Sequence, residues 1–146
     1  MNSSRVLEED VEINASPERV FAAWTEARHM MAWWKNDKEF YTEHFENDLR
    51  AGGRWLVRFK TTDGNTVGAQ GTYVRVERPT HLSFTWKADW DTGEPTLMEL
   101  EFLPSENGTL VKLRHSGFDE TGWQNANKEV WHETLDALQR YLALKP

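Results

Sequence analysis

The residues able to do acid–base or metal chemistry are five scattered histidines and a large excess of carboxylates. A helical metal site needs two ligands on one face, at spacings such as His-x-x-x-His or Glu-x-x-His, and no predicted helix carries such a pair. His132 and Glu133 are neighbours, so on a helix their side chains point about 100° apart. The chain has no cysteine, which excludes thiolate nucleophiles and cysteine-ligated metals. We expect no metal and no other cofactor.

His115 is the histidine best placed for chemistry, because it shares the inward parity of Leu113 on a predicted strand. A histidine buried among apolar walls can act as a general base, can orient a ligand, or can be purely structural. A nucleophilic hydrolase is not indicated, since His115 and Ser116 point to opposite faces and no Gly-x-Ser-x-Gly motif is present. We assign no catalytic residue, and we favour a non-enzymatic role while leaving catalysis open.

A second candidate lies on the only long helical pattern, at about residues 123 to 144. Its predicted buried stripe comprises Val130, Trp131, Thr134, Leu135, Leu138, Tyr141 and Leu142. Two polar residues, Asn127 and Thr134, lie about one turn on either side of Trp131 and point the same way. They either bond within their own helix, or face a bound polar group or ordered water, because an unpaired buried amide or hydroxyl is costly.

Shorter elements must position these residues. Ser16-Pro17-Glu18 is a helix start, because serine caps, proline suits the first helical position and glutamate favours the positive dipole end. A second short helix follows at Met30 to Trp34. Alternation with period two predicts strands at about 5–14, 41–47, 54–60, 68–76, 82–87, 97–102 and 110–115. Asp63-Gly64 and Asn107-Gly108 are hairpin turns.

These elements predict an α+β fold with a curved antiparallel sheet of about six to seven strands wrapped around the long C-terminal helix. Two short helices between the first and second strands would close one end. A sheet with one apolar face must cover that face, and only the C-terminal helix is long enough to do so. The inward side chains of the strands, including Trp55, Phe59 and Trp86, would line the space between sheet and helix.

Composition limits the partners. The 146 residues form a single predicted domain, 1–146, and no stretch is long and apolar enough to be a signal peptide or a membrane span. We therefore expect a cytoplasmic protein with no membrane partner. The net charge of −7, without a basic stripe, opposes nucleic-acid binding. Exposed strand edges in such a sheet can pair, so a weak homodimer is left open.

The order of motifs resembles a known family. The motifs are Ala15-Ser16-Pro17-Glu18-Arg19-Val20-Phe21-Ala22-Ala23-Trp24-Thr25, Trp33-Trp34, Gly52-Gly53-Arg54-Trp55, Gly71-Thr72-Tyr73, Leu82-Ser83-Phe84-Thr85-Trp86, His115-Ser116-Gly117-Phe118 and Trp131-His132-Glu133-Thr134-Leu135-Asp136-Ala137-Leu138. Together they resemble the bacterial activator-of-heat-shock-protein-90-ATPase-homologue-like proteins of the START-like (SRPBCC) superfamily. The resemblance covers nearly the whole chain and implies a helix-grip fold around an apolar cavity.

The resemblance leaves three functions open: binding or carriage of a small hydrophobic or aromatic molecule, a cavity enzyme of the polyketide cyclase or aromatase kind, and co-regulation of a chaperone ATPase. We favour binding, since it needs only a cavity with few polar groups. The predicted ligand-binding residues are Trp34, Trp55, Phe59, Tyr73, Trp86, Leu100, Leu113, His115, Asn127, Trp131, Thr134 and Leu135. The chain departs from many relatives at two places, with Lys35-Asn36 after the paired tryptophans and Val130 in place of glycine, and Val130 should alter the cavity beside Trp131.

Overall fold

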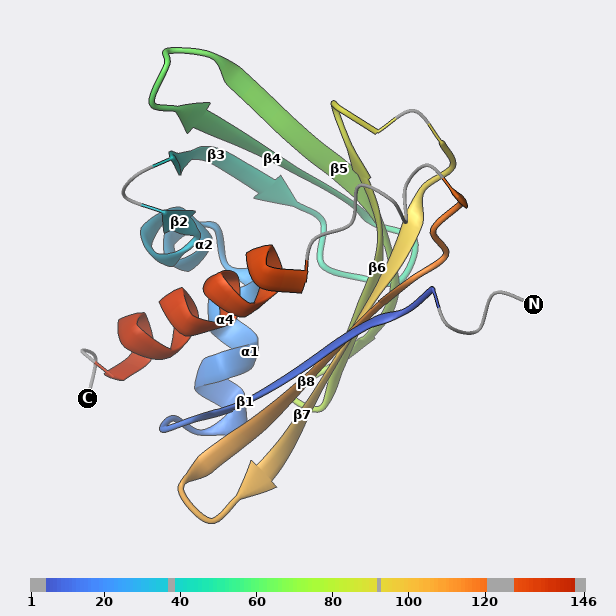
Figure 1. The fold of residues 1–146 in the computed structure, drawn as a ribbon. Coiled ribbons are helices and arrows are strands. Elements are labelled where there is room, and N and C mark those ends of the chain that lie inside the picture. Colours follow the sequence, from blue (N-terminus) through green and yellow to red (C-terminus); the bar gives the residue numbers. More distant parts are fainter. Residues whose placement is uncertain (1–4, 37–38, 92, 121–127, 144–146) are drawn as a thin grey trace.

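The computed structural model describes residues 5–36, 39–91, 93–120 and 128–143 (Figure 1). Its elements are β1 (Leu7–Ile13), α1 (Pro17–Thr25), α2 (Ala27–Trp33), β2 (Lys35–Asn36), β3 (Phe40–Asn47), β4 (Arg54–Thr61), β5 (Thr66–Glu77), β6 (His81–Ala88), β7 (Thr96–Ser105), β8 (Gly108–Ser116) and α4 (Lys128–Ala143). The predicted α+β class is confirmed, with the helix-grip arrangement of a curled sheet around the C-terminal helix.

The strands form one antiparallel sheet in the order β1-β8-β7-β6-β5-β4-β3-β2. From β2 to β8, every strand pairs with its neighbour in the chain, as short hairpin connections require. The exception is β1, which is the edge strand opposite β2 and pairs with β8. Within the described residues the sheet has eight strands rather than six or seven, because the two-residue strand β2 extends it at one edge.

The first helix begins as its sequence predicts. The Ser16 side chain accepts a hydrogen bond from the Arg19 backbone N–H at 3.3 Å, and Pro17 occupies the first turn. The buried face of α1 carries Phe21, whose ring packs edge to face on Phe102 of β7 with centroids 5.9 Å apart. This contact fixes α1 to the sheet at β7.

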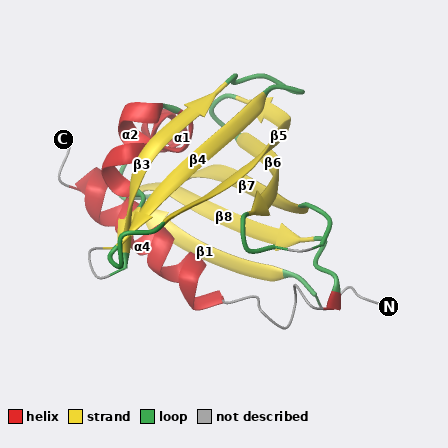
Figure 2. Ribbon diagram, turned by 90° about the horizontal axis from the view of Figure 1, so that it is seen from above, coloured by secondary structure: helices red, strands yellow, loops and turns green. Residues whose placement is uncertain are grey.

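The C-terminal helix lies across the concave face of the sheet, beside α1 and α2 (Figures 1 and 2). Trp131, Leu135 and Leu138 are buried as predicted. Val130 is 48% exposed, so its place on the buried stripe is wrong. It lies about 100° from Trp131, at the edge of the stripe and in the first turn of the helix, where less of the sheet covers it.

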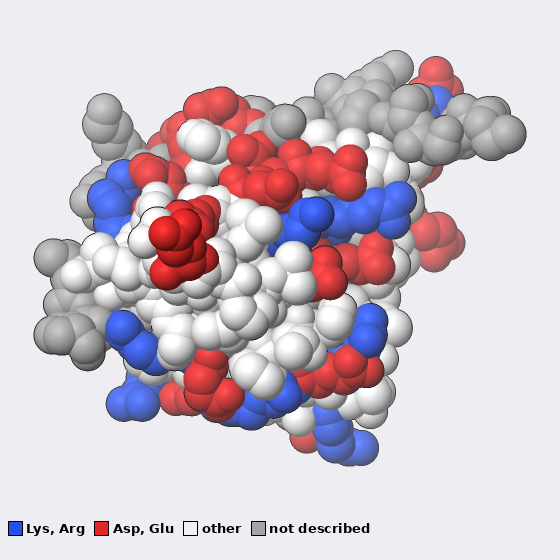
Figure 3. All heavy atoms as spheres, turned by 90° about the horizontal axis from the view of Figure 1, so that it is seen from below, with Lys and Arg blue, Asp and Glu red and all other residues white. Residues whose placement is uncertain are grey.

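The outer surface carries mixed charge. On the face shown in Figure 3, basic side chains lie close to acidic ones. Neighbouring strands carry such pairs, with Arg114 of β8 3.4 Å from Glu99 of β7. Among the described residues, no helix is long and apolar enough to cross a membrane.

Candidate functional site

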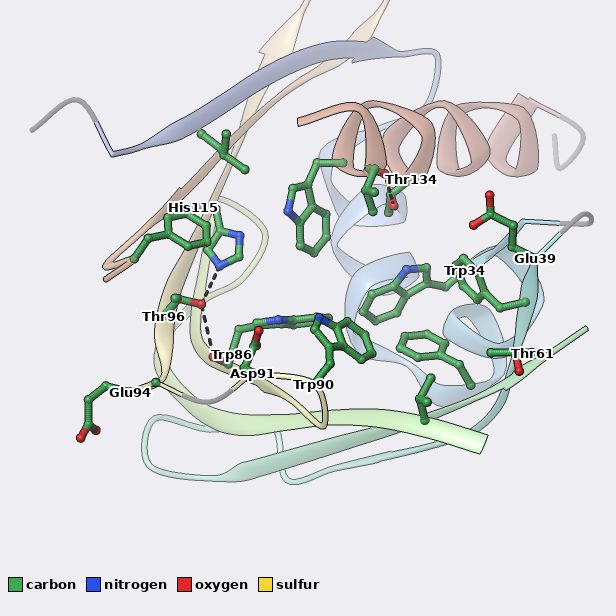
Figure 4. A pocket seen from close by; sticks show the side chains of 18 of the residues that line it. Trp34, Glu39, Thr61, Trp86, Trp90, Asp91, Glu94, Thr96, His115 and Thr134 are labelled. Atoms are coloured by element: carbon green, nitrogen blue, oxygen red, sulfur yellow. Dashed lines mark hydrogen bonds between the residues drawn. The ribbon is translucent and has the colours of Figure 1, made fainter. Parts of the chain in front are cut away.

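A cavity of about 530 Å³ lies between the sheet and the first turns of α4. Figure 4 shows Trp34, Trp86 and His115 pointing into the same space, which Thr134 of α4 covers from the helix side. The walls come from α4, from the end of α2, from strands β1 and β3 to β8, and from the loops that follow β6 and β8, so the cavity exists only when the sheet has closed around the helix. It opens to solvent at its rim, where Trp90 is 60% exposed.

Half of the predicted ligand-binding residues line this cavity: Trp34, Phe59, Trp86, His115, Trp131 and Thr134. Leu100, Leu113 and Leu135 are in the packed core instead. Trp55 and Tyr73 line a separate void of about 10 Å³. Asn127 falls outside the described residues.

Trp55 shows why parity was insufficient to predict the lining. It points inward as predicted, but its ring packs on Trp86 with centroids 5.7 Å apart, and Trp86 in turn packs on Trp131 at 5.5 Å. Trp55 therefore supports the wall from behind. Its indole N–H donates to the Thr85 carbonyl at 3.2 Å, and Gly71 makes room for it, because a Cβ there would be 2.8 Å from that nitrogen.

His115 is the most deeply buried polar side chain of the cavity wall, with only 4% of its surface exposed. Its Nε2 lies 2.6 Å from the Thr96 hydroxyl, and its Nδ1 is buried with no hydrogen-bond partner. The rings of Phe118 and Trp131 pack against the imidazole, with centroids 4.5 and 5.6 Å away. Burial lowers the pKa of His115 from 6.5 to about 4, so the side chain is neutral at physiological pH.

Of the two outcomes expected for Thr134, the structure shows a hydrogen bond within its own helix. Its hydroxyl donates to the Val130 carbonyl one turn earlier, at 2.8 Å, as threonine commonly does within helices. Its polar group is therefore satisfied without a ligand. Tyr73 is likewise satisfied, since its hydroxyl accepts from the Asn47 amide at 3.0 Å, and burial raises its pKa to about 12.

Sequence reasoning missed the residues that loops and strand ends bring to the cavity. The apolar ones are Leu7, Phe40, Val67, Trp90 and Phe118, and the acidic ones are Glu39, Asp91, Glu94 and Asp119. Val130, expected to affect the space beside Trp131, also lines it. Loop residues have no periodicity, so no sequence pattern predicts the direction of their side chains. Trp90 alone gave a signal, because a tryptophan between Asp89 and Asp91 in a turn is unusual.

The site offers apolar surface and few reactive groups. In the part of the chain that the structure describes, no group of three histidine, aspartate or glutamate side chains is arranged to hold a metal ion. His115 is the most deeply buried titratable side chain of the lining, and its side-chain hydrogen-bond partner is a threonine rather than a carboxylate. This arrangement suits binding of an apolar molecule with one or two polar groups.

Comparison with known proteins identifies the family. Residues 14–143 match the family model described as Activator of Hsp90 ATPase homolog 1-like protein. Among curated proteins, no match to the chain was found. The similar solved structures include a protein from Rhodobacter sphaeroides, with 25% identity over 97% of this chain and 95% of that one and a TM-score of 0.87.

Two further solved structures are also similar to this chain. An AHSA1-like protein from Aeromonas hydrophila is 25% identical, covers 95% of this chain and 92% of its own, and has a TM-score of 0.81. A protein from Nitrosomonas europaea, 18% identical over 99% of this chain and 98% of its own with a TM-score of 0.84, shares the fold. The START-like fold supports ligand binding in general. The chain belongs to the family of Activator of Hsp90 ATPase homolog 1-like proteins, within the START-like superfamily.

Proposed function

We propose that the protein binds a small hydrophobic or aromatic molecule in the cavity between the sheet and α4. The observation that carries the proposal is the cavity itself: its volume of about 530 Å³ lies in the range typical of small-molecule sites, and aromatic rings form much of its wall. A solid core would gain more by closing this space, because unfilled volume sacrifices packing contacts. The exposed Trp90 lies at the rim and gives the space a route to solvent.

Catalysis of the cyclase or aromatase kind is less well supported. Such an enzyme would need a convergent acid–base pair, and His115 stands on the inner wall with Thr96 as its side-chain partner. With its pKa lowered to about 4, His115 is also a weak base at neutral pH. These features favour binding without chemistry.

A screen of flavonoids, polyketides and fatty acids by thermal shift and tryptophan fluorescence tests the proposal. A ligand should raise the melting temperature and change tryptophan emission, because Trp34, Trp86 and Trp131 all line the cavity. Native mass spectrometry of the freshly purified protein would reveal a co-purified occupant. If no compound shifts the melting temperature and no bound mass is found, the proposal is wrong.

Trp131→Ala should weaken binding more than it weakens folding. The matched control is Leu142→Ala on the same helix, since Leu142 is buried but does not line the cavity. We expect the control variant to have a lower melting temperature than the wild type but the same dissociation constant for the ligand. Equal losses of affinity in both variants would show that binding depends on overall stability rather than on the wall.

A further inference from the structure

Polar groups of two kinds line the cavity. His115 and Thr96 lie together in the wall, and Figure 4 shows the carboxylates of Asp91 and Glu94 on the same side of the cavity as this pair and that of Glu39 on the opposite side. Asp119 adds a fourth carboxylate. Among the described residues that line the cavity there is no lysine or arginine. The Lys87 ammonium bonds to the Gly93 carbonyl on the neighbouring loop.

The hydrogen bonds around Thr96 decide which nitrogen of His115 carries the proton. A threonine hydroxyl has a single hydrogen, and here it donates to the Trp86 carbonyl at 3.2 Å, which can only accept. With the hydroxyl hydrogen directed at the Trp86 carbonyl, we assign the 2.6 Å contact between Thr96 Oγ1 and His115 Nε2 to donation by the imidazole N–H. A neutral imidazole has one N–H, so Nδ1 is left with a bare lone pair and acts as an acceptor.

This acceptor is unsatisfied. His115 Nδ1 is buried and has no hydrogen-bond partner in the described structure. Buried polar atoms are nearly always paired, and each exception needs an explanation. Figure 4 shows the imidazole on the cavity side of its bond to Thr96. The rings of Phe118 and Trp131 pack beside it, so contact between Nδ1 and a ligand donor requires one of these rings to move.

We propose that the occupant is an aromatic compound that has an O–H or N–H donor for His115 Nδ1 and carries no negative charge. The inference rests on the proposed function and specifies its ligand class. A phenol, an indole-like ring or an aromatic ammonium satisfies both conditions. A carboxylate satisfies neither, because it has no donor, meets no cationic side chain among the described residues of the lining, and is repelled by the acidic ones. We therefore expect fatty acids not to bind.

Three naphthalene probes test this with one shared apolar body: 2-naphthol has a donor, 2-methoxynaphthalene has none, and 2-naphthoate is anionic. We expect 2-naphthol to bind about tenfold more tightly than 2-methoxynaphthalene, the effect of one net hydrogen bond, and 2-naphthoate to bind more weakly than either. Isothermal titration calorimetry at pH 7.5 measures all three. If the first two bind equally, or 2-naphthoate binds best, the inference is wrong although the cavity still binds aromatics. If none binds, the proposed function fails with it.

Two variants connect the selectivity to the tautomer. His115→Phe removes the acceptor but keeps a ring, so in this variant 2-naphthol should bind no more tightly than 2-methoxynaphthalene. Thr96→Val removes the hydroxyl that fixes the proton on Nε2, so the preference for 2-naphthol should shrink. Thr96→Ser retains the hydroxyl and should retain the preference.

Nitrogen-15 NMR of the histidine ring provides a readout that needs no ligand. In the wild type and in Thr96→Ser, the proton should reside on Nε2 of His115, whereas Thr96→Val should show a mixture of the two tautomers. A wild-type proton on Nδ1 would overturn the inference, because that nitrogen would then be a donor and would select for acceptors instead.

Discussion

The two halves of α4 face different surroundings although they share one apolar stripe. The first half presents Trp131 and Thr134 to the cavity. The second half presents Leu138, which has no exposed surface, and Leu142 to a closed core. Neighbouring helices hold this second half: the Arg19 guanidinium of α1 donates to the Leu142 carbonyl at 3.3 Å, and His29 of α2 lies 2.7 Å from the Tyr141 hydroxyl.

The difference separates stability from binding along one helix. Leu138 and Leu142 are buried where the core is closed. Around the cavity, an indole and a hydroxyl of α4 form part of the wall, and β8 contributes the unpaired nitrogen of His115. Substitutions in the closed half should therefore act on folding, and substitutions in the cavity half should act on ligand affinity or on the pH dependence of folding.

The largest effect is expected at Leu138. Leu138→Ala removes a fully buried side chain and leaves a void in the closed half, so the free energy of unfolding should fall by about 2 to 5 kcal/mol. Urea denaturation followed by circular dichroism measures this. Ligand affinity of the folded variant should stay within about twofold of wild type, because Leu138 lies outside the lining. An unchanged midpoint would show that the closed half is not tightly packed.

A smaller loss of folding stability is expected at His115 when the pH is lowered. Its pKa is lowered from 6.5 to about 4 in the folded protein, so as the pH falls the unfolded chain binds this proton first. The stabilising contribution of the neutral form is present above pH 6.5 and is lost progressively towards pH 4. At the lower pH the loss should amount to about 3 kcal/mol.

Urea denaturation of wild type and His115→Gln from pH 7.5 to 4 measures this effect as the difference between their free energies of unfolding. Glutamine does not titrate, while every other ionisable group is retained, so the difference isolates His115. The wild type should lose more stability than the variant as the pH falls. Parallel curves would mean that the cavity half lets water or a counter-ion reach the imidazole.

The smallest effect is expected at Thr134. Thr134→Val keeps the shape of the side chain and removes only a hydroxyl that bonds to the Val130 carbonyl of its own helix. The free energy of unfolding should therefore change by less than about 1 kcal/mol. Binding of 2-naphthol should change by less than about threefold. Calorimetric titration of both proteins checks this, and a tenfold loss would show that the hydroxyl contacts the ligand and belongs to the site.

The sequence predicted the elements because their signals are local. The cap at Ser16 and the period of two along β4, β6 and β8 depend on neighbours a few residues away, and a buried face imposes that period whatever the partner strand is. Trp86 and His115 were predicted as inward residues for this reason, and Trp131 was predicted from the helical period of α4. Val130 was misplaced, because a helical wheel gives the direction of a side chain but not how far the covering sheet extends.

Only the tertiary structure decided which inward residues meet empty space. Trp55 and Trp86 have the same parity, yet Trp86 faces the cavity and Trp55 packs behind it, because depth depends on strand register and curvature. The acidic lining and Trp90 come from loops and strand ends whose directions no period specifies. The composition and the order of motifs thus determined the fold and the apolar character of the interior. The unpaired nitrogen of His115 and the charge of the lining emerged only when distant segments closed around α4, because their surroundings are made by residues far apart in the chain.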